Sequence, residues 1–139
     1  MLDPAKVPEV GLNERLSRYV LTKRHVNQET KLPKADAFVP HPYDELSVTR
    51  DLDATEDEIW EAGQRVAAQR GKPLIGRGDV IAATYVGQKL KTIPDPVEEN
   101  PNHVNVANWP SDKPQQRLIA LEIAAVATFV ETPMSGEAG

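Results

Sequence analysis

Three histidines are the side chains of this sequence best suited to metal binding or proton transfer: His25, His41 and His103. No two of them have the i, i+4 spacing that places a pair of zinc ligands on one helix face. A metal site would therefore need the histidines to converge, in the folded chain, with carboxylates such as Asp44 or Asp79. The simpler interpretation is that each ring bonds to nearby backbone, and we expect no bound metal.

The run Gly76-Arg77-Gly78-Asp79 is the sharpest local motif. Two glycines around an arginine allow a tight turn with free N–H groups, and the guanidinium beside them could hold a phosphate or carboxylate. The alternative is an ordinary glycine-rich turn in which Arg77 and Asp79 pair with each other. No Gly-Lys-Ser/Thr follows the run, so it is not a nucleotide-binding P-loop.

Cationic and imidazole side chains stand at the ends of several predicted strands. They are Arg24, His25, Arg50, Arg77 and His103. If the strand ends meet at one edge of a sheet, these side chains form a basic pocket, with Asp79 beside it, for a small anionic ligand or a nucleotide. His25 and His103 would then be the candidate catalytic residues, acting as general acid and base.

Composition limits the classes of function. The 16 Lys and Arg residues against 21 Asp and Glu residues give a net charge of −5, which argues against nucleic-acid binding by bulk electrostatics. The absence of cysteine excludes disulfides, thiolate metal sites and a cysteine nucleophile. No apolar run approaches the roughly 18 residues of a membrane span. The N-terminus does not resemble a signal peptide, so we expect a cytoplasmic protein, and we expect no cofactor.

The first of two main helices is predicted at about 56–70. Thr55 and Glu58 have the spacing of a capping box, in which each side chain satisfies a free backbone N–H of the first turn. Acidic residues fill that turn, where the helix dipole favours negative charge. Gly71 is placed to end the helix in the left-handed conformation.

The second main helix is predicted at about 113–130, with Ser111 or Asp112 as its cap. One apolar stripe contains Leu118, Leu121, Ala125 and Thr128. A neighbouring stripe contains Ile119, Ile123, Val126 and Val130. Two adjacent stripes make a broad apolar face, so this helix is expected to be the most buried of the protein.

Short strands account for the rest of the expected core. The strand candidates are 37–39, 46–50, 80–86, 90–93 and 103–106. The segment 80–86 also suits a helix, but its β-branched residues favour a strand. A short helix fits the segment 12–20, where the stretch 18–22 fits a strand equally well. Twelve prolines divide the chain into short blocks. The expected fold class is α+β, a single small domain with a short, mostly antiparallel sheet packed by the two main helices.

The domain is expected to span 12–131, between a flexible N-terminal segment, 1–11, and a flexible C-terminal tail, 132–139. Trp60 and Trp109 each lie at the predicted start of a main helix. We expect them to pack there as lids. If exposed, they would instead be partner-binding anchors.

Several segments together carry a resemblance to a known group of proteins. They are Arg24-His25, 37–40, 46–50, 58–60, 76–79, 101–103 and 109–113. They resemble a family of short uncharacterised bacterial proteins, often called hypothetical, over roughly residues 16–127. The resemblance implies a bacterial source, a single compact domain and a setting near conflict or phage-defence genes. It implies no activity, because these motifs match no catalytic signature.

Two functions from different classes follow. The first is an accessory interaction protein that docks on a larger protein, with the loops 29–36 and 94–102 giving specificity. The second is a small enzyme or sensor that binds a phosphate-bearing ligand through the Arg/His pocket. Convergence of the five cationic side chains around one concavity would favour the second function. Their dispersal, together with an exposed apolar patch, would favour the first, which we prefer.

Overall fold

Six strands form one antiparallel sheet in the order β4-β5-β2-β1-β3-β6. The structure is a computed structural model and describes residues 6–40 and 44–133. The strands are β1 (Arg15–Val20), β2 (Leu46–Arg50), β3 (Gly76–Ile81), β4 (Lys91–Pro94), β5 (His103–Ala107) and β6 (Thr128–Glu131). The helices are α1 (Glu56–Gln69), α2 (Ala82–Gly87) and α3 (Lys113–Val126), with 3-10 turns η2 (Lys23–His25) and η3 (Ala35–Phe38). The predicted α+β fold with an antiparallel sheet is confirmed.

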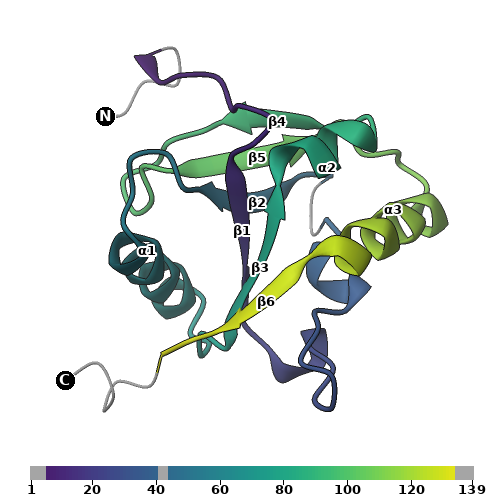
Figure 1. Ribbon diagram of the computed structural model, residues 1–139, viewed down its shortest axis with the longest axis horizontal. Coiled ribbons are helices and arrows are strands. Elements are labelled where there is room, and N and C mark those ends of the chain that lie inside the picture. The colour runs from purple at the N-terminus through teal and green to yellow at the C-terminus, as the bar shows by residue number, and fades with distance from the viewer. Residues whose placement is uncertain (1–5, 41–43, 134–139) are drawn as a thin grey trace.

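The two faces of the sheet carry cores of different size. Leu16 and Val20 of β1 belong to the main core, which α3 and η3 cover. Because side chains alternate along a strand, Tyr19 points to the other face, where it packs with Ile59 and Ala62 of α1 in a small second core. Figure 1 shows α1 on one side of the central strands and α3 on the other. Much of the surface beneath α1 is polar, and the site described below lies there.

The predicted first helix is present as α1. The hydroxyl of Thr55 accepts from the Glu58 N–H, and the Glu58 carboxylate accepts from the Thr55 N–H, which completes the capping box. Gly71 follows the helix with a φ of 61°, the left-handed conformation that favours glycine.

The second helix is shorter than predicted. Asp112 caps α3, but the helix ends at Val126, and Thr128–Glu131 form the edge strand β6 beside β3. The β-branched Thr128 and Val130 suit a strand, and the pairing with β3 overrides the helical periodicity. The expectation that this would be the most buried helix was wrong for one of its stripes, because Leu118 and Leu121 are 63% and 49% exposed.

Three other local predictions were wrong. The segment 37–39 belongs to η3 and the residue after it, not to a strand. Most of the segment 80–86 is the short helix α2, since β3 ends at Ile81. The predicted turn at Gly76–Asp79 is the middle of the sheet: Gly78 lies under the Phe38 ring and Gly76 under Phe129, where a Cβ would meet ring atoms at 2.9 and 2.5 Å. These glycines provide room for aromatic rings rather than a turn.

The segment 12–20, left open between helix and strand, contains β1. Within the segment expected to be flexible, the carbonyl oxygens of Pro8 and Glu9 accept hydrogen bonds from Arg50. Residues 1–5 and 134–139, which hold the rest of the two expected flexible ends, and His41 lie outside the described residues. No helix in the described ranges has the length and hydropathy needed to cross a bilayer.

Candidate functional site

The structure disperses the five cationic and imidazole residues that could have formed one pocket. Arg24 and His25 lie on η2, and Arg77 is a buried residue of β3. Arg50 and His103 belong to paired strands, but His103 stands opposite Thr49, so its side chain lies on the sheet face opposite to that of Arg50. Each of the four hollows found on residues 6–40 and 44–133 is lined by at most one of the five.

Arg50 holds the N-terminal segment. Its guanidinium is 3% exposed and forms a two-pronged ion pair with Glu14, with nitrogen–oxygen distances of 2.8 and 2.7 Å. The remaining donors bond to the carbonyl oxygens of Pro8 and Glu9 at 2.7 and 3.0 Å. Burial alone would raise the pKa of Glu14, but hydrogen bonds from Arg50 and the Gly11 N–H hold it below its ordinary value. Arg50 is committed to this segment and faces no cavity.

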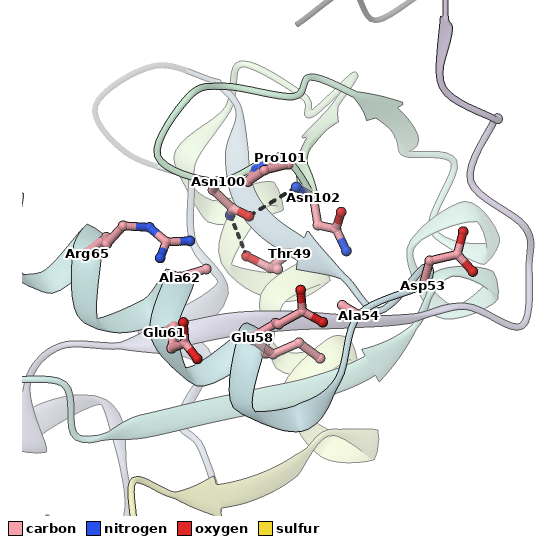
Figure 2. Close-up of a pocket in the computed structure, with 11 residues that line it drawn as sticks. Thr49, Asp53, Ala54, Glu58, Glu61, Ala62, Arg65, Asn100, Pro101 and Asn102 are labelled. Carbon is pink, nitrogen blue, oxygen red and sulfur yellow. Dashed lines mark hydrogen bonds between the residues drawn. The ribbon is translucent and has the colours of Figure 1, made fainter.

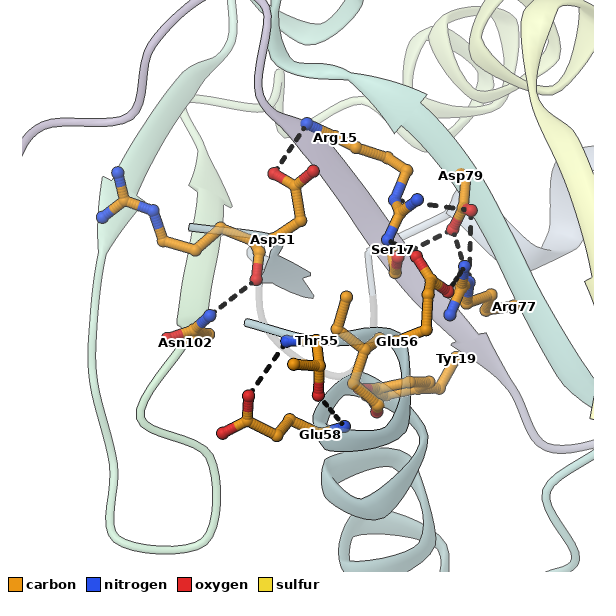
Figure 3. A network of polar contacts seen from close by, with 12 residues as sticks. Arg15, Ser17, Tyr19, Asp51, Thr55, Glu56, Glu58, Arg77, Asp79 and Asn102 are labelled. Atoms are coloured by element: carbon orange, nitrogen blue, oxygen red, sulfur yellow. Dashed lines mark hydrogen bonds and ion pairs between the residues drawn. The ribbon is translucent and has the colours of Figure 1, made fainter. Parts of the chain in front are cut away.

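Arg77 lies in a network of ionic contacts between the sheet and the first turn of α1. Its Nη2 donates to Glu56 at 2.6 Å and its Nε to Asp79 at 3.1 Å. Arg15 bonds the other oxygen of Glu56 at 2.6 Å, and Ser17 donates to Asp79 at 2.7 Å. Figure 3 shows these side chains converging under the start of α1. Hydrogen bonds from Arg77 and Arg15 hold the pKa of Glu56 below its ordinary value, against a smaller opposing effect of burial.

The same network accounts for Trp60. The guanidinium carbon of Arg77 is 4.6 Å from the centroid of the Trp60 ring, a cation–π contact that helps to enclose the charge. Two arginines and two carboxylates balance each other, so the network has no net charge to offer an anion. The predicted alternative, a pair between Arg77 and Asp79, is present. The network as a whole ties α1 to the sheet, through the contacts of Glu56 with Arg77 and Arg15.

The two described histidines occupy different environments. Nδ1 of His103 lies 2.9 Å from the backbone oxygen of Asp95 and 3.2 Å from a carboxylate oxygen of the same residue. Asn105 donates to that carboxylate at 3.1 Å, which fixes the start of the loop before β5. His25 is half-buried on η2, where burial and the nearby Arg18 cation lower its pKa. The two rings share no hollow, so they do not form an acid–base pair.

Trp109 is buried, at 7% exposure, and its indole N–H donates to the backbone oxygen of Val106 at 2.9 Å. Trp60 is partly buried against Arg77. Both rings pack near the start of a main helix, and Trp109 offers little surface to a partner.

A groove between α1 and the loop before β5 is a polar concavity on the α1 side of the sheet. Its volume is about 280 Å³. We call it the α1 groove. It is lined by Thr49, Asp53, Ala54, Glu58, Ile59, Glu61, Ala62, Arg65, Asn100, Pro101 and Asn102. Figure 2 shows the asparagines and Thr49 facing α1 across this space.

The floor of the α1 groove is built from amide groups held in place. Asn100 is 3% exposed, and its Nδ2 donates to the Thr49 hydroxyl at 2.8 Å. Its Oδ1 accepts from the Asn102 N–H at 3.1 Å. The Asn102 side chain in turn donates to the backbone oxygens of Arg50 and Leu52. Because these polar atoms are already paired, the floor is pre-formed.

The rim of the α1 groove is acidic. Asp53, Glu58 and Glu61 stand on one wall, and Asp53 has a φ of 52°, a conformation that few non-glycine residues adopt. Arg65 is the one cation among the lining residues, and its Nε donates to the backbone oxygen of Glu99 at 2.7 Å. In the described part of the chain, no group of three or more histidines and carboxylates could hold a metal ion. The charged side chains that line the groove are thus three carboxylates and one guanidinium.

Sequence reasoning missed the α1 groove because its members come from three separate segments. The loop 94–102 was singled out, but only as a source of specificity. The one local signal was the capping box of Thr55 and Glu58, which sets the start of α1. On that helix, Glu58 and Glu61 lie one turn apart. Nothing in the sequence showed that the asparagines of the loop would face that helix.

Comparison of the chain with models of protein families, with curated proteins and with solved structures gives no match.

Proposed function

We propose that this protein is an accessory interaction module that docks on a larger protein partner and receives a basic side chain of that partner in the α1 groove. The observation that carries the proposal is the combination of a pre-formed amide floor with three rim carboxylates and a single, engaged arginine. A lysine or arginine side chain matches this site, because its aliphatic stem can lie along Ala54 and Pro101 while its charged end reaches the rim.

The dispersal of the five cationic residues supports docking over the alternative function. An enzyme or sensor for a phosphate-bearing ligand needs several cations around one concavity. Here Arg50 and Arg77 are already paired with carboxylates, and the hollow on the α1 side is acidic. A phosphate would be repelled by that rim.

The charge of the α1 groove sets specificity more than affinity. Ion pairs near the surface contribute about 0–1 kcal/mol each and weaken with salt. Most of the binding free energy must then come from contacts that the partner makes outside the groove. The family resemblance adds the expectation that the partner belongs to a conflict or phage-defence system, and that setting stays a prediction.

Affinity capture with matched variants tests this proposal. The double variant Asp53→Asn/Glu61→Gln removes two rim charges and leaves Glu58, which caps α1, unchanged. Asparagine tolerates the left-handed conformation at position 53. Glu45→Gln removes an exposed charge that does not line the α1 groove and is the control.

We expect a stoichiometric partner that the wild type and Glu45→Gln retain and the double variant loses. The purified partner should rebind the wild type more weakly as salt is raised. Equal retention by the double variant, or no retained partner with the wild type, would contradict the proposal.

A further inference from the structure

Helix α3 carries a second apolar stripe that the fold of one chain leaves uncovered. Gln116, Ala120 and Ile123 are buried against the main core. On the opposite side of the helix, the exposed residues are Pro114, Leu118, Leu121 and Ala125. We call these four residues the outer stripe. A helix that is apolar on both sides is normally buried on both.

The other long helix shows what a solvent-facing side looks like in this protein. Helix α1 has the same length of 14 residues as α3. Its exposed positions are Glu56, Asp57, Glu58, Glu61, Gln64, Arg65, Ala68 and Gln69. The exposed positions of α3 also include Lys113, Gln115, Arg117 and Glu122, so the outer stripe is an uncharged row between polar flanks. Its composition is that of a contact surface.

The spacing within the outer stripe identifies the kind of surface that fits it. Its residues follow one another at intervals of four, three and four, which is the spacing of a coiled-coil seam. Such a seam packs against a second helix with the same spacing. When two copies of α3 run antiparallel, Leu118 faces Leu121 of the second copy, and Pro114 faces Ala125.

The residues beside the outer stripe agree with pairing of two copies. In the antiparallel arrangement each flank meets the same flank of the other helix. Arg117 then lies beside the second copy's Ala124, and Glu122 lies beside the second copy's Gln115, which can donate to the carboxylate. No like charges are brought together. Arg117 also keeps its 2.6 Å ion pair with Asp36.

We infer that the protein forms a two-fold homodimer through the outer stripe of α3, packed antiparallel against the same stripe of a second copy. The interface is isologous, so each contact occurs twice. Helix α1, which is one wall of the α1 groove, lies on the opposite side of the central strands from α3, so the groove stays accessible in the dimer. The dimer therefore does not depend on the proposed docking function, and each can fail without the other.

Sedimentation velocity on the purified full chain tests the dimer. The wild type is expected to have twice the 15.3 kDa mass of one chain. Leu118→Glu and Leu121→Glu are each expected to give the single-chain mass, with Leu121→Gln as a milder version. Val126→Glu is the matched control: Val126 is 62% exposed, as Leu118 is at 63%, but it lies off the stripe on the same helix. It should remain dimeric.

A wild type of single-chain mass at the highest soluble concentration would overturn the inference. So would a Val126→Glu variant as fully dissociated as Leu121→Glu. Unchanged circular dichroism of the monomeric variants confirms that the fold survives, as expected for substitutions at exposed positions.

Cross-linking tests the antiparallel arrangement, since the natural chain has no cysteine. A mixture of the Leu118→Cys and Leu121→Cys proteins is expected to form a disulfide-linked heterodimer. Ala125→Cys alone should stay unlinked, because position 125 would face Pro114 of the second copy. Linkage of Ala125→Cys without linkage in the mixture would contradict the antiparallel packing.

Discussion

Glu56 accepts a hydrogen bond from Arg77 at 2.6 Å, so the first turn of α1 is bound directly to a strand in the interior of the sheet. The second core between α1 and the sheet is small. Its buried residues are Tyr19, Ile59 and Ala62, with Leu21, Ala54, Val66 and Leu74 packed against them. Ionic contacts at the first turn add to this packing in positioning α1. Because α1 is one wall of the α1 groove, the network also fixes the shape of that groove.

Replacing Arg77 should be costly to stability. Arg77→Ala leaves the carboxylate of Asp79, which is 9% exposed, without its strongest partner, and breaking a buried pair in this way costs about 3–5 kcal/mol. Glu56→Gln should cost about 1 kcal/mol or less, because Glu56 is 56% exposed. Urea unfolding measures both. Arg117→Ala, which breaks an exposed pair, is the control, and an equal loss in Arg77→Ala and Arg117→Ala would refute the structural role.

The β3 strand should not tolerate a side chain at Gly76. A Cβ there would lie 2.5 Å from both the Phe129 ring and the Val130 backbone oxygen, so backbone must move. We expect Gly76→Ala to lower the free energy of unfolding by about 1–3 kcal/mol, as in other overpacked sites. Gly87→Ala meets no atom within 4 Å and should be neutral or slightly stabilising. Thermal melting that ranks the two variants the other way would contradict the placement of β6 on β3.

Arg50 should control the order of the N-terminal segment. Lysine at this position keeps the charge but cannot form the two-pronged pair with Glu14 while bonding to Pro8 and Glu9. Arg50→Lys is therefore expected to speed amide hydrogen exchange in residues 9–14 while exchange in α3 stays slow. Arg24→Lys, at an exposed position, is the control. Unchanged exchange in Arg50→Lys would show that the segment is held by other contacts.

Acid should destabilise the fold through its paired carboxylates. The pKa values of Glu14 and Glu56 lie below the ordinary 4.5 in the folded chain. The stabilisation that these groups supply is therefore complete above about pH 4.5 and is lost as the pH falls through the folded pKa. We expect the melting temperature to drop below that pH.

Glu14→Gln and Glu56→Gln should each make this acid loss shallower and lower the stability at neutral pH. Melting curves collected across the acid range measure both effects. If the melting temperature of the double variant Glu14→Gln/Glu56→Gln falls with acid as steeply as that of the wild type, other carboxylates are responsible for the pH dependence.

Local signals predicted the elements whose ends are set by nearby residues. The capping box at Thr55 and Glu58 located α1, and the alternation of Leu46 and Val48 located β2. Predictions failed where distant contacts decide. Thr128–Glu131 continues the helical period of α3 but becomes a strand because β3 lies beside it. In the sequence, Gly76 and Gly78 suggest a turn. In the fold, the rings of Phe129 and Phe38 occupy the space that a Cβ at these positions would need.

The candidate pocket failed for a similar reason. Strand-end cations were expected to meet, but neighbouring positions on a strand point to opposite faces. The side chains of Arg50 and Thr49 therefore lie on opposite faces of the sheet, and the His103 side chain lies on the same face as that of Thr49. Glu14, which pairs with Arg50, and Glu56, which pairs with Arg77, lie 36 and 21 residues away in the chain, so no local pattern predicted these two pairs; the Arg77–Asp79 pair, two residues apart, was the one that the sequence predicted.

The most direct test of the α1 groove as a receptor for a basic side chain is an amide chemical-shift titration of the ¹⁵N-labelled protein. The probe is a short neutral peptide with one central arginine. Its control is the same peptide with citrulline, which has nearly the same shape and no charge. We predict saturable shifts in α1 and residues 99–102 with the arginine peptide, absent with citrulline and absent in Asp53→Asn/Glu61→Gln. Equal shifts with both peptides, or shifts elsewhere only, would contradict the account.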